Sequence, residues 1–100
     1  MIVAIHAYEG IYGGLHGIEN FFVTEVENLK VAENIALGLA NDVIEDYEYN
    51  FEEEDLEDPD LLWEIYEVTD TKGKTVDELD GEYNYDPEGF FTKYNCVQVA

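Results

Sequence analysis

The chain contains no arginine and no serine, and only four lysines face 25 aspartate and glutamate residues. The absence of serine excludes a serine nucleophile. The formal net charge of −21 at pH 7 repels both the phosphates of nucleic acids and the anionic head groups of lipid membranes. We therefore expect neither direct nucleic-acid binding nor attachment to a membrane surface.

Cysteine is equally scarce, because Cys96 is the only one. A single thiol forms neither an intramolecular disulfide nor a cysteine-based zinc site. No run of 18 apolar residues is present to span a membrane, and the start, MIVAIHAYEG, lacks the basic segment of a secretory signal. These features predict a cytoplasmic protein, acting in the host cytoplasm if a phage encodes it.

Apolar residues nevertheless make up 46% of the chain, as in ordinary globular proteins, which argues against intrinsic disorder. We interpret residues 1–100 as a single domain, because this length supports one core. A net charge of magnitude about 2–8 keeps such a domain soluble. The surplus of carboxylates therefore needs another explanation, and binding to a cationic surface is the simplest.

The sequence predicts an α+β fold. Segments rich in β-branched and aromatic residues predict strands at 2–8, 19–26, 61–69 and 95–99. The first two should form an adjacent antiparallel pair, joined by the glycine-rich connector 10–17. We expect an antiparallel sheet of about four strands, with one long amphipathic helix packed on one face and one or two short helices.

The long helix is predicted at 29–49, with Asn28 as its N-cap. Apolar residues recur there at three- and four-residue steps, which indicates one buried stripe. Its members are Val31, Ala32, Ile35, Ala36, Leu39, Val43 and Tyr47. A capping box at Thr75 and a proline after Asp86 predict the starts of two short helices.

Fourteen acidic residues and no basic residue lie between Asp42 and Asp70. Exposed helices usually mix both signs and gain from Glu–Lys pairs at four-residue spacing. This run contains no lysine to form such pairs, and its like charges repel one another. We therefore prefer a functional acidic surface to a merely solvated one. Helix positions three or four apart have Cβ atoms about 5–6 Å apart, a separation similar to that of successive phosphates along a nucleic-acid strand.

The candidate partner-binding residues are the carboxylates of this run and one tyrosine, whose ring can receive an arginine guanidinium. They are Asp42, Glu45, Asp46, Glu48, Tyr49, Glu52, Glu53, Glu54, Asp55, Glu57, Asp58, Asp60, Glu64 and Glu67. The expected partner is a basic nucleic-acid-binding protein or complex, such as a host defence or repair enzyme. The protein itself would act as a monomer or homodimer.

A strongly acidic, aromatic-rich chain of this size without arginine resembles the small inhibitors that phages and mobile elements encode against host nucleic-acid enzymes. DNA mimics of this class block restriction enzymes, uracil glycosylase or CRISPR surveillance complexes. The resemblance implies an inhibitor that occupies the nucleic-acid-binding surface of its target. It rests on size and on the Asp42–Asp70 run, without a family motif, so no functional residue is carried over.

Two other functions fit the same composition. An immunity protein or antitoxin could neutralise a basic nuclease toxin by binding beside its active site, and an ordinary module of a halophile could carry the same charge. We do not expect an enzyme, a metal site or a cofactor. His6 and His16 lack a patterned partner, and Asp77–Glu82 fails the EF-hand pattern because Leu79 and Gly81 replace oxygen ligands.

Overall fold

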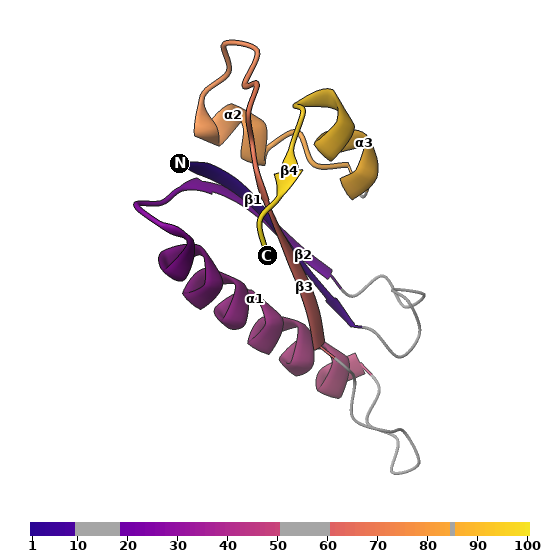
Figure 1. The fold of residues 1–100 in the computed structure, drawn as a ribbon. Helices are drawn as coiled ribbons and strands as arrows, with labels where there is room; N and C mark the ends of the chain where they lie inside the picture. The colour runs from indigo at the N-terminus through magenta and orange to yellow at the C-terminus, as the bar shows by residue number, and fades with distance from the viewer. Residues whose placement is uncertain (10–18, 51–60, 85) are drawn as a thin grey trace.

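The computed structural model describes residues 1–9, 19–50, 61–84 and 86–100. Along the chain the elements are β1 (Ile2–Glu9), β2 (Glu19–Glu25), α1 (Leu29–Asn50), β3 (Leu61–Glu67), α2 (Val76–Asp80), α3 (Pro87–Lys93) and β4 (Val97–Gln98). The predicted α+β fold, with one long helix on an antiparallel sheet, is confirmed (Figure 1). Within the described ranges, no helix combines the length and apolar composition needed to cross a membrane.

The sheet has the order β2-β1-β3-β4, and every neighbouring pair is antiparallel. The predicted pairing of the first two strands is confirmed, and Ile5 lies opposite Phe22 on β2 and Ile65 on β3. The last strand is shorter than predicted: β4 spans Val97–Gln98, opposite Glu67 and Tyr66, although Val99 and Ala100 still hydrogen-bond to Ile65 through their backbones.

Helix α1 packs on one face of the sheet, which carries Val3 and Ile5 of β1. Alanines 32, 36 and 40 are fully buried, and their small side chains let the helix axis approach the sheet. Asn28 caps the helix as predicted, because its Oδ1 atom accepts a hydrogen bond from the Val31 backbone N–H at 3.1 Å. Val31 itself corrects the predicted stripe, since its side chain is 38% exposed: the stripe runs through residues 32, 36, 40 and 43 and leaves position 31 outside.

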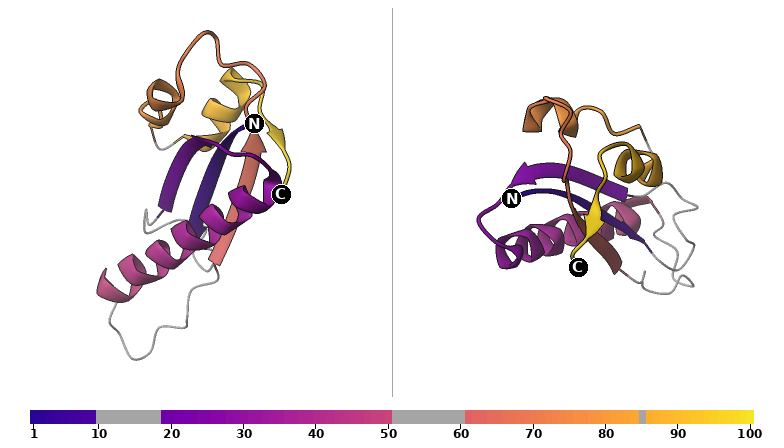
Figure 2. Two further views of the ribbon diagram at one scale, coloured as in Figure 1. Left: turned by 90° about the vertical axis from the view of Figure 1, so that its left-hand side faces the viewer. Right: turned by 45° about the horizontal axis from the view of Figure 1, so that its top comes forward.

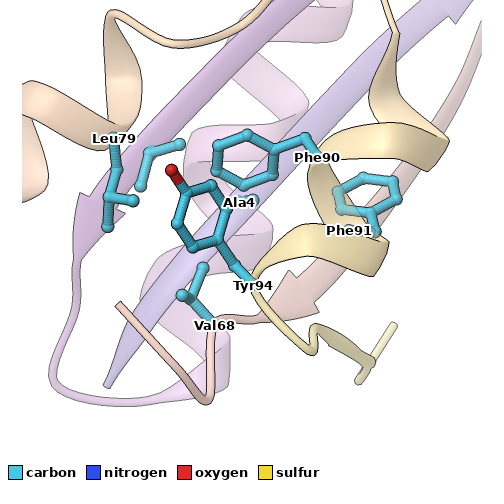
Figure 3. Packing of buried hydrophobic residues seen from close by; sticks show 7 residues of the cluster. Ala4, Val68, Leu79, Phe90, Phe91 and Tyr94 are labelled. Atoms are coloured by element: carbon cyan, nitrogen blue, oxygen red, sulfur yellow. The ribbon is translucent and has the colours of Figure 1, made fainter. Parts of the chain in front are cut away.

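Helices α2 and α3 cover the opposite face, so the sheet lies between two helical layers (Figure 2). Alternation along β1 explains the two cores, because Ala4 points away from the face that Val3 and Ile5 share. Figure 3 shows Phe90, Phe91 and Tyr94 of the α3 segment gathered over Ala4, with Leu79 of α2 beside them. These rings and aliphatic side chains form the second core.

Both short helices begin where the sequence predicts. Glu78 N–H donates to Thr75 Oγ1, and Thr75 N–H donates to Glu78 Oε1, each at 3.2 Å, which completes the capping box. Asp86 caps α3 by accepting from Gly89 N–H at 3.0 Å, with Pro87 in the first turn. Local capping hydrogen bonds therefore determine where along the chain these two helices begin.

Helix α2 covers part of the edge strand β2, whereas the inner strand β3 leaves one large side chain partly exposed. Asp80, the last residue of α2, accepts a hydrogen bond from the Val23 backbone N–H at 2.8 Å and so covers part of the open edge of β2. Trp63, the only tryptophan, lies on β3 opposite Ala7 of β1 and is 40% exposed.

Candidate partner-binding surface

The structure describes the side chains of three of the predicted partner-binding residues: Asp42, Glu64 and Glu67. Four others, Glu45, Asp46, Glu48 and Tyr49, lie on the described backbone of α1, but their side chains are not described. The remaining seven, Glu52, Glu53, Glu54, Asp55, Glu57, Asp58 and Asp60, lie outside the described residues. Their binding of a partner stays a prediction.

Helix α1 carries the start of the acidic run on its outer side. Asp42 is exposed, and positions 42, 45 and 49 follow one another at three- and four-residue steps. The helical period places these positions away from the buried positions 36, 40 and 43. Asp42 therefore projects from a helix that the sheet holds in place.

Glu64 and Glu67 do not lie together. Glu64 pairs with His6, whereas Glu67 pairs with Val3, and residues three apart on a strand point to opposite faces. Glu67 therefore lies on the face that α1 covers, and Glu64 lies on the face of α2 and α3. The strand cannot present both in one row on a single face.

Glu64 instead contacts a buried histidine. His6, at 6% exposure, lies between two carboxylates on the two neighbouring strands. Its Nε2 atom is 2.5 Å from Glu19 Oε2, and its Nδ1 atom is 3.3 Å from Glu64 Oε1. A neutral imidazole has one N–H, so only the doubly protonated ring can donate to both carboxylates. The Tyr8 ring stacks on it with centroids 4.8 Å apart.

This cluster was missed by the sequence interpretation, which found no patterned partner for either histidine. His6 is buried, while His16 lies outside the described residues. Glu19 and Glu64 are 13 and 58 positions from His6, and only the strand register brings them together. In the part of the chain that the structure describes, no group of three or more His, Cys, Asp or Glu side chains could hold a metal ion.

Burial raises the pKa of three groups on or beside this face. Burial, followed by the charge of Glu64, raises the pKa of the Tyr8 hydroxyl. Burial is also the main cause of the raised pKa of Tyr66, with Glu64 and Glu88 adding to it. Burial alone raises the pKa of the Cys96 thiol to about 11, so this cysteine is not an activated nucleophile at neutral pH.

Two of the four lysines lie in the helical layer of α2 and α3, on the other side of the sheet from α1. Lys74 and Lys93 both pair with Glu82, the second at 3.7 Å between Nζ and Oε2. The Tyr94 hydroxyl also donates to Glu82, and Lys93 Nζ lies 5.3 Å from the centre of the Tyr94 ring. These two lysines are therefore engaged within the layer of α2 and α3, and this layer and the C-terminal end of α1 lie at opposite ends of the molecule (Figures 1 and 2).

A pocket of about 460 Å³ opens between residues 82–84 and α3. Its carboxylates already have partners within the chain: Glu82 binds Lys74 and Lys93, and Asp86 caps α3. The polar groups of the pocket thus serve the fold.

Comparison of the chain with protein-family models, curated proteins and solved structures finds no match. Function is therefore inferred from the charge and geometry of the chain itself.

Proposed function

We propose that this protein is a non-catalytic acidic inhibitor that occupies the nucleic-acid-binding surface of a basic host enzyme or complex, as a DNA mimic of the anti-restriction or anti-CRISPR type. One observation carries the proposal: the separation of charge. The run from Asp42 to Asp70 has no basic residue, and its first part lies on α1. Lys74 and Lys93 are bound to Glu82 in the other helical layer, on the far side of the sheet from Asp42.

The packing of α1 supports the proposal as well. Alanines 32, 36 and 40 are fully buried against the sheet, so the helix holds the exposed Asp42 on a fixed backbone. A pre-organised array loses less conformational freedom on binding than a flexible acidic tail does. A basic groove that meets this array would release its own bound anions and be steered towards it by the long-range field.

The test begins with capture of a partner from bacterial lysate on the immobilised protein, identification by mass spectrometry, and purification of that partner. Its affinity is then measured by titration calorimetry at low and moderate salt, and in competition with duplex DNA. We expect affinity to fall at least tenfold between roughly 50 and 200 mM salt, as for proteins that bind several phosphates. Duplex DNA should displace the inhibitor.

A matched pair of variants separates local from total charge. The first neutralises the run through Glu52→Gln, Glu53→Gln, Glu54→Gln and Asp55→Asn. The control removes the same charge from exposed positions elsewhere, through Glu25→Gln, Glu27→Gln, Glu88→Gln and Asp77→Asn. The first variant should weaken binding much more than the control.

Affinity that is insensitive to salt, or equal losses in the two variants, would contradict the mimic. Binding to a nuclease that duplex DNA does not displace would favour the immunity-protein alternative.

A further inference from the structure

Strand β3 extends past its neighbour β4 at one side of the sheet. In the described chain, β4 and the residues after it hydrogen-bond to β3 as far back as Ile65. No described strand lies beside residues 61–64 on that side, although β1 pairs with them on the other. The left view of Figure 2 shows the beginning of β3 running beyond β4. We call residues 61–64 the open β3 edge.

The backbone of Trp63 points outward at the open β3 edge. Ile65 N–H donates to Ala100 O at 3.1 Å, and Ile65 O accepts from Val99 N–H at 2.8 Å, so residue 65 directs its backbone groups away from β1. The two directions alternate along an antiparallel strand, and Trp63 is two residues from Ile65. The N–H and C=O of Trp63 therefore point away from β1 as well, and no described residue hydrogen-bonds to them.

The side chain of Trp63 lies next to these unpaired groups. It is 40% exposed and shares the face of Ile65. When an extended peptide adds to a sheet edge, main-chain hydrogen bonds supply affinity and side-chain contacts supply specificity. Tryptophan is one of the residues that contribute most energy at interfaces. The open β3 edge thus combines the two features that strand addition uses.

We propose that the open β3 edge binds an extended segment of a basic protein as an added antiparallel strand, with an arginine of that segment opposite Trp63. That arginine would exchange both backbone hydrogen bonds with Trp63 and place its Cβ atom about 4.5–5.5 Å from the tryptophan Cβ, on the same face. Its guanidinium could then lie against the indole ring, the best aromatic partner of a cation. The inference goes beyond the proposed function, because the segment need not belong to a protein that binds nucleic acid.

The charge of the chain selects a basic segment. Strand β3 carries one described carboxylate on each face, Glu64 and Glu67, and none of the four lysines lies on a strand. Two copies with a net charge of −21 repel each other, which protects the edge from pairing with itself. The same charge attracts a cationic segment.

Three synthetic peptides of one sequence test the added strand. Each carries lysines at both ends and one central arginine. The first is unmodified. The second is N-methylated at the arginine, which removes the N–H that would donate to the C=O of Trp63. The third is N-methylated at the next residue, whose N–H would point away from β3, and is the matched control.

We expect the first and third peptides to bind equally, and the second to bind about fivefold more weakly, the effect of one lost hydrogen bond. Replacing the arginine by neutral citrulline should weaken binding as well. Titration calorimetry measures these affinities.

Variants of the protein test the side chain. Trp63→Ala should lower affinity for the first peptide by about tenfold, with circular dichroism confirming that the variant is folded. The control is Val97→Ala, which shortens a 55% exposed apolar side chain on β4 and should not change the affinity.

Amide hydrogen exchange tests the edge directly. In the free protein the Trp63 amide should exchange with solvent faster than the Glu64 amide, which faces β1. Binding of the first peptide should slow exchange at Trp63.

Slow exchange of the Trp63 amide in the free protein, or equal affinities of the two methylated peptides, would overturn the added strand and leave the proposed function intact. Unchanged affinity of folded Trp63→Ala, or failure of every peptide to bind at low salt, would overturn it in the same way. A dimer in sedimentation experiments that Trp63→Ala abolishes would overturn it in favour of a second copy. The salt and duplex-competition measurements on the captured partner decide the proposed function separately.

Discussion

At the scale of single residues, His6 joins the three longest strands through its side chain. Its ring nitrogens face Glu19 on β2 and Glu64 on β3, while its own backbone belongs to β1 between them. Both carboxylates are at most 24% exposed. The imidazole lies within hydrogen-bond distance of each of them and so links the three strands.

We expect His6→Leu to lower the free energy of unfolding by about 2–3 kcal/mol, because it removes the ring that lies within hydrogen-bond distance of two partly buried carboxylates. Urea denaturation followed by circular dichroism measures this change. Adding Glu19→Gln to His6→Leu should recover part of the loss, since it removes one of the two unpaired charges. A loss below about 0.5 kcal/mol, the level of an ordinary surface substitution, would show that the cluster contributes nothing to stability.

Cys96 provides a prediction about chemical reactivity. Burial raises the pKa of its thiol from 9.0 to about 11, so at pH 8 the folded protein holds about a hundredfold less thiolate than the unfolded chain. Reaction with a disulfide reagent should therefore be slower by that factor in buffer than in urea. The rate in buffer should rise with pH up to about 11, and equal rates in both conditions would contradict the buried thiol.

At the scale of elements, one carboxylate hydrogen-bonds α2 to the sheet in addition to the packing of Leu79. Asp80 accepts from the backbone N–H of Val23, which is almost fully buried on the edge strand β2. Asp80→Ala would leave this donor unpaired, and we expect a loss of about 1–3 kcal/mol, measured by urea denaturation. Asp77→Ala, an exposed position of the same helix, is the control and should change stability much less.

Local patterns predicted most elements correctly. The period of α1, the β-branched strands and the caps at Thr75 and Asp86 each depend on residues close in sequence, and the structure confirms them. Val31 shows the limit of this approach, because an apolar residue at the margin of a stripe satisfies the pattern whether it is buried or exposed.

Long-range pairing accounts for what the sequence did not predict. The order β2-β1-β3-β4 inserts β3 next to β1 across more than fifty residues, and this pairing places Glu64 beside His6. Alternation along β3, which the interpretation of the acidic run did not take into account, places Glu64 and Glu67 on opposite faces. Neither the helical layer opposite α1 nor the partners of His6 follow from local periodicity.

At the scale of the whole molecule, the net charge of −21 opposes the folded state through self-repulsion. Raising NaCl from about 10 mM to about 1 M shortens the screening length from roughly 30 Å to 3 Å. We therefore expect the melting temperature to rise with salt, and to rise less in the variant neutralised at residues 52–55. A melting temperature that is constant or falls would contradict this, whereas loss of the fold below molar salt would favour the halophile alternative.

Trp63 is an intrinsic fluorescent probe of the electrostatic potential around the acidic run. It is the only indole, it lies within the acidic run in sequence, and it is partly exposed on β3. The negative potential around Trp63 attracts caesium ions and repels iodide. We therefore expect caesium to quench its fluorescence more strongly than iodide does. A cationic protein bound over the run would remove the difference in quenching between the two ions. Its binding can therefore be followed by tryptophan fluorescence without labelling either protein.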